Sequence, residues 1–266
     1  MFRPTTLQNK SGMEPILNPP FGIDVIEATL AYGEKVILDR ASLAADAGDV
    51  VGLLGSNGAG KSTFFDILCG IKPAATLITA SIFTPEDCVY LSQTITTPAA
   101  LKMSEIADMV ELLSDETDGS SMRHRREELI GPHKIARFVE LGKKRSGICS
   151  YGEKRWFITM CLLALDRSIY ILDEPTSGVD PEYRFYIWQA VEVLRRRQKT
   201  ILVSSHLVGE IADNCGYFYF LVNGKFTRYA DGLAFMTAFE CDSLDAAFIR
   251  AAQCWSPAAL GPHSRA

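Results

Sequence analysis

The sequence lacks several features that would assign it to a specialised class of protein. No apolar run approaches the ~18 residues needed to span a bilayer, and the N-terminus lacks the charged-then-apolar layout of a signal peptide. Its seven cysteines form no C-x-x-C pair, which disfavours a zinc or redox site and fits reduced thiols. The net charge of −5 gives no global attraction to nucleic acid, so no nucleic-acid partner is expected. What remains is an ordinary globular composition, with 47% hydrophobic and 22% charged residues.

The order of apolar segments predicts an α/β fold that begins with antiparallel strands. Two β-like runs meet at Gly33-Glu34, and their connection is too short for a crossover helix. Further on, strands alternate with helices, which indicates a mainly parallel sheet. After residue 54 we expect strands at 88–91, 168–172, 200–204, 216–222 and 225–227, and helices at 63–68, 104–138 (with a loop over 114–121), 155–165 and 183–196. We also expect residues 1–20 to form a flexible leader and residues 229–266 to form a short helical extension, frayed from Ser256.

Residues 55–62 match the phosphate-loop pattern G-x-x-x-x-G-K-S/T at every fixed position. The loop lies between an apolar strand-like run and a helix start, where its backbone N–H groups and the helix N-terminus are expected to hold phosphate. The expected nucleotide-binding residues are Gly55, Ser56, Asn57, Gly58, Ala59, Gly60, Lys61, Ser62 and Thr63. Lys61 is expected to reach the β- and γ-phosphate oxygens, and the Ser62 hydroxyl to ligate Mg²⁺. The sequence therefore predicts binding of a nucleoside triphosphate.

A second feature is the apolar strand at 169–172, which ends in Asp173 and Glu174. In a phosphate-loop protein such a strand delivers its first carboxylate next to Mg²⁺, and the second can act as general base on the attacking water. We therefore expect Asp173 to be a metal residue and Glu174 to be catalytic. Acidic residues that merely end a strand are the alternative for the motif taken alone.

Cys149-Ser150-Tyr151-Gly152-Glu153 lies between the phosphate loop and this acidic pair. With it, the chain resembles the ATP-binding cassette (ABC) ATPase family, whose signature is L-S-G-G-Q. Ser150 and Gly152 match that signature, whereas Cys149, Tyr151 and Glu153 depart from it. In the family the serine and glycine contact the γ-phosphate of ATP held by the opposite subunit, so the resemblance implies the same contact in trans here. The three departures bear on how strongly and how fast two subunits would close around ATP, more than on whether they close.

Four more residues stand where the family has functional positions. The resemblance implies that Asp180, in a D-loop at residues 177–180, acts in trans and that His206 is the switch histidine next to the γ-phosphate. It implies that Gln93 is a Q-loop glutamine that reaches Mg²⁺ and the attacking water, and that Tyr32 stacks on adenine. An exposed loop glutamine and a strand-end core tyrosine are the alternatives for the last two.

The resemblance implies a P-loop NTPase core with a mainly parallel sheet, an N-terminal antiparallel β subdomain and an inserted α-helical subdomain. We expect the ABC ATPase domain over residues 21–228, with the helical subdomain at about 100–150. The implied cofactors are ATP and Mg²⁺, and the implied partners are a second cassette and an integral membrane permease. The chain would then be a cytoplasmic ATPase, peripheral on the membrane. A soluble single-cassette ATPase switch, for example of the cluster-assembly type, is the alternative.

Overall fold

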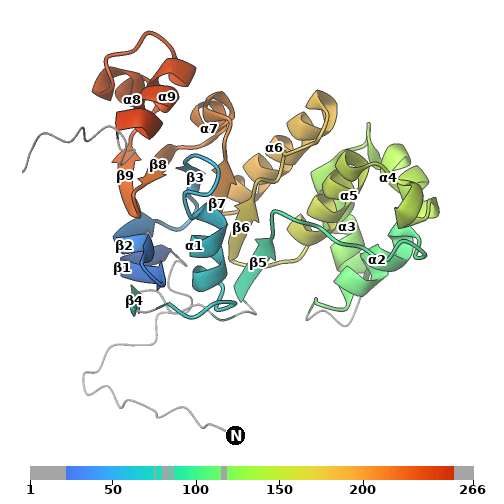
Figure 1. Cartoon of the computed structure of the whole chain (residues 1–266). Coiled ribbons are helices and arrows are strands. Elements are labelled where there is room, and N and C mark those ends of the chain that lie inside the picture. Colours follow the sequence, from blue (N-terminus) through green and yellow to red (C-terminus); the bar gives the residue numbers. More distant parts are fainter. Residues whose placement is uncertain (1–21, 75, 80–83, 85–86, 115–118, 255–266) are drawn as a thin grey trace, which may run out of the picture.

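A computed structural model of the chain describes residues 22–74, 76–79, 84, 87–114 and 119–254 (Figure 1). The expected leader over residues 1–20 and the frayed end from Ser256 lie outside the described residues. The described part has an α/β fold with one larger, mainly parallel sheet and one smaller antiparallel sheet. None of its helices is long and apolar enough to cross a bilayer.

The larger sheet has six strands within the described residues, in the order β5-β6-β7-β3-β8-β9. They are β3 (Val50–Leu54), β5 (Cys88–Leu91), β6 (Ile169–Asp173), β7 (Thr200–Ser205), β8 (Tyr217–Val222) and β9 (Lys225–Tyr229). All neighbours are parallel except β9, which pairs antiparallel with β8. Since β6, β7 and β3 are adjacent and parallel, their carboxyl ends share one edge of the sheet, where ligands bind in such folds. That edge carries Asp173, Ser205 and the start of the phosphate loop.

The smaller sheet consists of β1 (Ile23–Tyr32), β2 (Lys35–Ala45) and β4 (Thr76–Thr79), in the order β2-β1-β4. Its pairs are antiparallel, and β1 and β2 are joined at Gly33-Glu34 as the sequence predicts. β4 is not among the predicted strands. The two sheets share a hydrophobic core in which α1 (Lys61–Leu68) buries Phe64 and Phe65.

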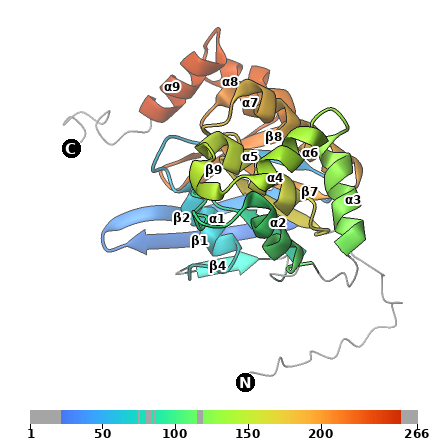
Figure 2. The same ribbon diagram turned by 90° about the vertical axis from the view of Figure 1, so that its right-hand side faces the viewer.

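Six further helices fall into two groups, on the flank of the larger sheet and in a helical lobe. α6 (Pro181–Arg196) and α7 (Val208–Asn214) belong to the first group. The lobe contains α2 (Met103–Glu111), α3 (Gly119–Ile130), α4 (Ile135–Lys143) and α5 (Tyr151–Leu163). Figure 1 shows the lobe beyond β5, on the side away from the antiparallel sheet, and in Figure 2 this side of the molecule faces the viewer. The architecture confirms the predicted fold class: a phosphate-loop core, an N-terminal antiparallel part and inserted helices.

Aromatic stacking attaches the lobe to the rest of the fold. Phe138 of α4 stacks on Phe157 of α5, with 4.0 Å between ring centroids. The neighbouring Trp156 is fully buried and stacks on Tyr183 of α6 at 4.4 Å. Stacked pairs of this kind add to the gain from burying apolar area. The stacked rings therefore join α4 to α5 within the lobe, and join α5 to α6 outside it.

Helix α5 begins four residues earlier than the sequence analysis expected. Ser150 is its N-cap: the Ser150 hydroxyl accepts from the Glu153 N–H at 3.1 Å, and the Glu153 carboxylate accepts from the Ser150 N–H at 2.9 Å. This reciprocal capping box satisfies two helix-end donors and is readable as S-x-x-E. The expected helix start at residue 155 was therefore wrong, because residues 151–153 of the signature segment (residues 149–153) already form the first turn of α5.

Two helices follow the larger sheet. α8 (Gly232–Ala238) and α9 (Leu244–Cys254) pack against β8 and β9. Phe235 of α8 is fully buried, and its ring lies 4.9 Å from Tyr229 and 5.5 Å from Phe218, measured between centroids. An aromatic cluster therefore holds these helices on the sheet.

Candidate nucleotide site

The phosphate loop connects β3 to α1 at the carboxyl edge of the larger sheet. Gly60 is the N-cap of α1 in the left-handed conformation, with φ of 112°, and provides no side chain to cap the helix. A Cβ at this position would lie 2.9 Å from Ile37 Cγ2, so glycine is required by both conformation and space. The N-terminal N–H groups of α1 therefore remain available to an anionic ligand.

Lys61 is buried at the start of α1, among the carbonyls of the loop and one carboxylate. Its Nζ donates to the Gly55 carbonyl at 2.7 Å and lies 3.8 Å from Glu174 Oε1. Burial lowers the pKa of this ammonium, while Glu174 and Asp173 act in the opposite direction. A phosphate entering the loop would offer Lys61 a stronger acceptor than a backbone carbonyl.

Asp173 at the end of β6 is held by the neighbouring strand. Ser204 Oγ donates to Asp173 Oδ1 at 2.5 Å and accepts from the Glu174 N–H at 3.0 Å. Asp173 Oδ2 is buried and has no hydrogen-bond partner among the described residues. One oxygen is thus fixed by the fold, and the other is available to a ligand.

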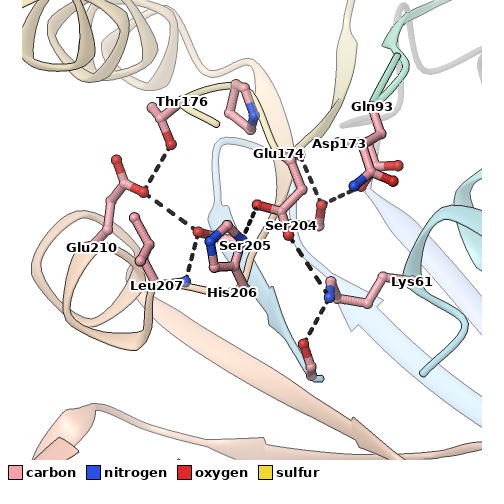
Figure 3. Close-up of polar contacts among 12 residues, drawn as sticks. Lys61, Gln93, Asp173, Glu174, Thr176, Ser204, Ser205, His206, Leu207 and Glu210 are labelled. Atoms are coloured by element: carbon pink, nitrogen blue, oxygen red, sulfur yellow. Dashed lines mark hydrogen bonds and ion pairs between the residues drawn. The ribbon is translucent and has the colours of Figure 1, made fainter. Parts of the chain in front are cut away.

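Glu174 and His206 form a direct contact across the ends of β6 and β7 (Figure 3). His206 Nδ1 lies 2.7 Å from Glu174 Oε2, and the Glu174 side chain is almost fully buried. Glu174 has a φ of 51°, which is uncommon for a non-glycine residue and costs on the order of 1–3 kcal/mol. Backbone strain at a buried carboxylate beside a phosphate loop is typical of a functional position.

Gln93, just after β5, completes one side of the same cavity. Its Oε1 accepts from Ser62 Oγ at 3.4 Å. The cavity has a volume of about 270 Å³. It is lined by Ile37, Asn57, Gly58, Ala59, Gly60, Lys61, Ser62, Thr63, Gln93, Asp173 and Glu174. The structure therefore brings most of the sequence-predicted residues together around one space.

Tyr32 does not line this cavity. It lies at the end of β1, opposite Lys35 in the hairpin, and 53% of it is exposed. From the same antiparallel sheet, Ile37 of β2 reaches the cavity instead. The Tyr32 ring is exposed at the rim of the sheet, and its contact with adenine stays a prediction.

The residues predicted to act in trans also lie outside the cavity. Ser150 caps α5, as described above, and Asp180 caps α6 by accepting from the Tyr183 N–H at 3.0 Å. A Cβ at Gly152 would lie 2.7 Å from the Gly178 carbonyl oxygen, so the glycine lets α5 approach the D-loop within one chain. Their contacts with a second chain stay predictions.

Two buried charges near the site were missed by the sequence analysis. Arg155 of α5 is fully buried and donates to backbone carbonyls after β5 and β6. Glu210 of α7 accepts from Thr176 Oγ1 at 2.8 Å (Figure 3) and from Trp188 Nε1 at 2.7 Å. Neither contact has a sequence signature, because each joins elements far apart in the chain.

A magnesium ion fits the residues present. The unpartnered Asp173 Oδ2, the Ser62 hydroxyl and the Gln93 amide oxygen are the oxygen donors that Mg²⁺ prefers, and Mg²⁺ commonly adds waters and substrate phosphates to a few such groups. The described residues hold no group of three or more His, Cys, Asp or Glu side chains placed to bind a metal. These three oxygen donors therefore suit a magnesium ion that binds together with the nucleotide. They do not form a site that encloses a metal ion with protein side chains alone.

Comparison with known proteins shows the family to which the chain belongs. The sequence profile of the family described as "ABC transporter" matches residues 38–177, from β2 to the D-loop. The chain belongs to the ABC transporter family, and it is an ATPase of the kind that serves as the ATP-binding subunit of a transporter. This confirms the family and the ATP-hydrolysing activity that the motifs imply.

Individual relatives extend the match over most of the chain. "Protein McbF" of Escherichia coli is 28% identical over 212 residues, which cover 76% of this chain and 84% of that protein. "Nod factor export ATP-binding protein I" of Rhizobium meliloti is 30% identical over 237 residues, which cover 83% of this chain and 67% of that protein.

Among solved structures, an ATP-binding subunit of an ABC transporter superposes with a TM-score of 0.74 at 20% identity, covering 85% of this chain and 98% of that one. A nucleotide-free ATP-binding cassette gives a TM-score of 0.68 at 18% identity over the same shares. These two solved structures therefore have the same fold as this chain.

Proposed function

We propose that this chain powers transport through a separate membrane permease, working as a dimer with ATP sandwiched between two cassettes. The observation that carries the proposal is the placement of the Glu174–His206 pair opposite Lys61 of the phosphate loop. Glu174 contacts the histidine through Oε2 at 2.7 Å, and its Oε1 lies 3.8 Å from the lysine ammonium. A base, a cation and a phosphate-binding loop are thus preassembled around one cavity.

The phosphate loop would bind the nucleotide. Its backbone N–H groups and the N-terminus of α1 suit the β-phosphate, and Lys61 would exchange its carbonyl partner for β- and γ-phosphate oxygens. Asp173, Ser62 and Gln93 would hold Mg²⁺, which when bound neutralises charge on the phosphates. The exposed Tyr32 ring would supply stacking for adenine, worth ~1–3 kcal/mol in base–aromatic contacts.

Hydrolysis would use Glu174 as the general base. The carboxylate takes a proton from water as the water oxygen attacks the γ-phosphorus, and the bond to the ADP oxygen breaks. His206 would hold the carboxylate in place through Nδ1, and as an imidazolium, with a proton on each ring nitrogen, it would also donate to the γ-phosphate from Nε2. Gln93 would orient the attacking water from the opposite side.

The cavity of one chain supplies too little positive charge for this reaction by itself. Lys61 is the one cationic side chain among the described residues that line it. Phosphoryl transfer needs the γ-phosphate neutralised on several sides. Ser150 and Gly152 of a second copy, at the N-terminus of its α5, would close the open side, with Asp180 contributing across the interface.

Closure and reopening of this dimer would be passed to a permease, which places the chain at the cytoplasmic face of a membrane. ATP favours the closed state, and hydrolysis removes that preference, which is a ligand-driven population shift. The helical lobe is suited to pass on the motion, because α5 joins it directly to the signature segment. The export named in the Nod factor relatives favours export as the direction for this chain.

Affinity purification tests the permease. The tagged Glu174→Gln chain is expressed in its native cell and recovered from detergent-solubilised membranes with Mg·ATP. We expect a stoichiometric integral membrane protein, and we expect less of it with Lys61→Ala, which should bind ATP more weakly. Recovery of soluble partners alone, with the chain absent from membranes, would contradict the permease and favour a soluble ATPase switch.

A further inference from the structure

Tyr151, one of the departures from the family signature, contacts two other motifs of the same chain. Its hydroxyl donates to the Gln93 carbonyl at 3.2 Å. Its ring lies against Gly178 of the D-loop, where a Cβ would come within 2.9 Å of Tyr151 Cδ1. A glycine at this signature position would make neither contact, because both need the side chain.

Arg155 lies one helical turn further along α5 and reaches the same carbonyl. Its guanidinium is fully buried and donates five hydrogen bonds, all to backbone carbonyls. Its Nη1 donates to the Gln93 carbonyl at 2.8 Å, and its Nη2 donates to the Glu174 carbonyl at 2.9 Å. The i,i+4 spacing places both side chains on one face of the helix. The Gln93 carbonyl therefore receives two donors from α5.

These contacts fix the backbone that aims the Gln93 side chain. With its carbonyl held by Tyr151 and Arg155, Gln93 directs Oε1 toward Ser62 Oγ, 3.4 Å away in the cavity. Arg155 adds the carbonyl of Glu174, so the Q-loop (residues 92–97) and the end of β6 share one anchor. A carbonyl with two donors is harder to rotate than a carbonyl with one, since both bonds must break together.

We propose that Tyr151 is a positioning residue that, together with Arg155, locks the Q-loop to the signature helix so that Gln93 points at the reacting phosphate. The effect on turnover rests on the function proposed above, in which Gln93 orients the attacking water. The mechanical link itself does not depend on that function. Movement of α5 at a dimer interface would then displace Gln93 in the same chain's own site.

Amide hydrogen exchange tests the link without any nucleotide. Tyr151→Phe keeps the ring on Gly178 and removes only the hydroxyl, so we expect faster exchange in residues 92–97 and unchanged exchange in α1. Tyr186→Phe is the matched control, because Tyr186 lies on α6 with its ring beside Lys134 and Phe185. Equal exchange in wild type and Tyr151→Phe would overturn the proposal.

A double-mutant cycle tests the consequence for catalysis in the full-length chain. We expect Tyr151→Phe to lower kcat roughly three- to ten-fold with KM for Mg·ATP within about two-fold, the size expected for one net hydrogen bond. In a Gln93→Ala background the same change should lower kcat less than about two-fold, because there is no side chain left to aim. An equal fall in both backgrounds, or an unchanged kcat in an active enzyme, would overturn the proposal. If Glu174→Gln hydrolyses ATP normally, the proposed catalytic roles fail instead, and the exchange experiment still decides the link.

Discussion

His206 Nδ1 lies 2.7 Å from Glu174 Oε2, and this contact joins the carboxyl ends of two neighbouring strands. The glutamate is almost fully buried, whereas the histidine side chain is 42% exposed. The histidine therefore contacts the buried carboxylate from the more exposed side, and its second ring nitrogen, Nε2, takes no part in this contact. Figure 3 shows the pair between Lys61 on one side and the Ser205–Glu210 contact on the other.

Replacement of His206 should slow hydrolysis without loss of nucleotide. We expect His206→Ala to lower kcat about 10²-fold, as for the loss of one preorganised donor, while ATP affinity changes less than about three-fold. Steady-state ATPase assays and nucleotide titrations measure both. His124→Ala, at an exposed position of α3, serves as the matched control and should behave as wild type. A wild-type kcat for His206→Ala would refute the role assigned to the contact.

Lys61 should be needed for binding as well as turnover. Lys61→Ala removes the one ammonium among the described residues that line the cavity, and a charge-assisted hydrogen bond is worth about 1.5–3 kcal/mol. We expect ATP affinity by isothermal titration calorimetry to fall roughly 10- to 100-fold. Lys225→Ala provides the comparison, because that ammonium is paired on the surface with Asp39 at 3.5 Å. Equal affinities of the two variants would contradict the assignment.

Ser204 should stabilise the fold at the site. Ser204→Ala removes the donor to Asp173 Oδ1 and the acceptor for the Glu174 N–H. Leaving a buried carboxylate oxygen without its donor costs about 1–3 kcal/mol. Urea unfolding of the nucleotide-free chain measures this loss, and ATPase assays should show a lower kcat. A free energy of unfolding within about 0.5 kcal/mol of wild type would show that Asp173 is held by other means.

Phe235 should matter for stability alone. Phe235→Ala removes a fully buried ring that contacts Tyr229 and Phe218, and such truncations cost about 3–5 kcal/mol. We expect thermal unfolding at a lower temperature, with the kcat of the folded protein unchanged. A specific fall in kcat at a temperature where the variant is folded would mean that α8 and α9 contribute to the site.

The residues that sequence alone identified are those whose chemistry is encoded by short-range spacing. Lys61 and Ser62 follow from the phosphate-loop pattern, and Glu174 follows from an apolar strand that ends in carboxylates. The structure places all three around one cavity. Tyr32 was assigned through family position, and the structure leaves its ring exposed outside the cavity.

The residues that sequence missed act through tertiary contacts. Arg155 donates to carbonyls from segments 18 to 63 residues away, so no local pattern marks it. Ser204 and Glu210 likewise act across neighbouring strands and helices. The early start of α5 was readable, since Ser150 and Glu153 have the spacing of a capping box. Helix caps are local, whereas buried hydrogen bonds depend on the whole fold.

The most direct test of the account is the mass and turnover of Glu174→Gln with Mg·ATP. We predict by light scattering twice the mass of the single chain, reverting to one chain without ATP, together with ATP turnover reduced at least 10²-fold. Glu127→Gln, on the exposed side of α3, should hydrolyse ATP as wild type does. A Glu174→Gln chain that binds ATP but stays a monomer would contradict the sandwiched dimer. A Glu174→Gln chain that hydrolyses ATP at the wild-type rate would contradict the role of Glu174 as the catalytic base.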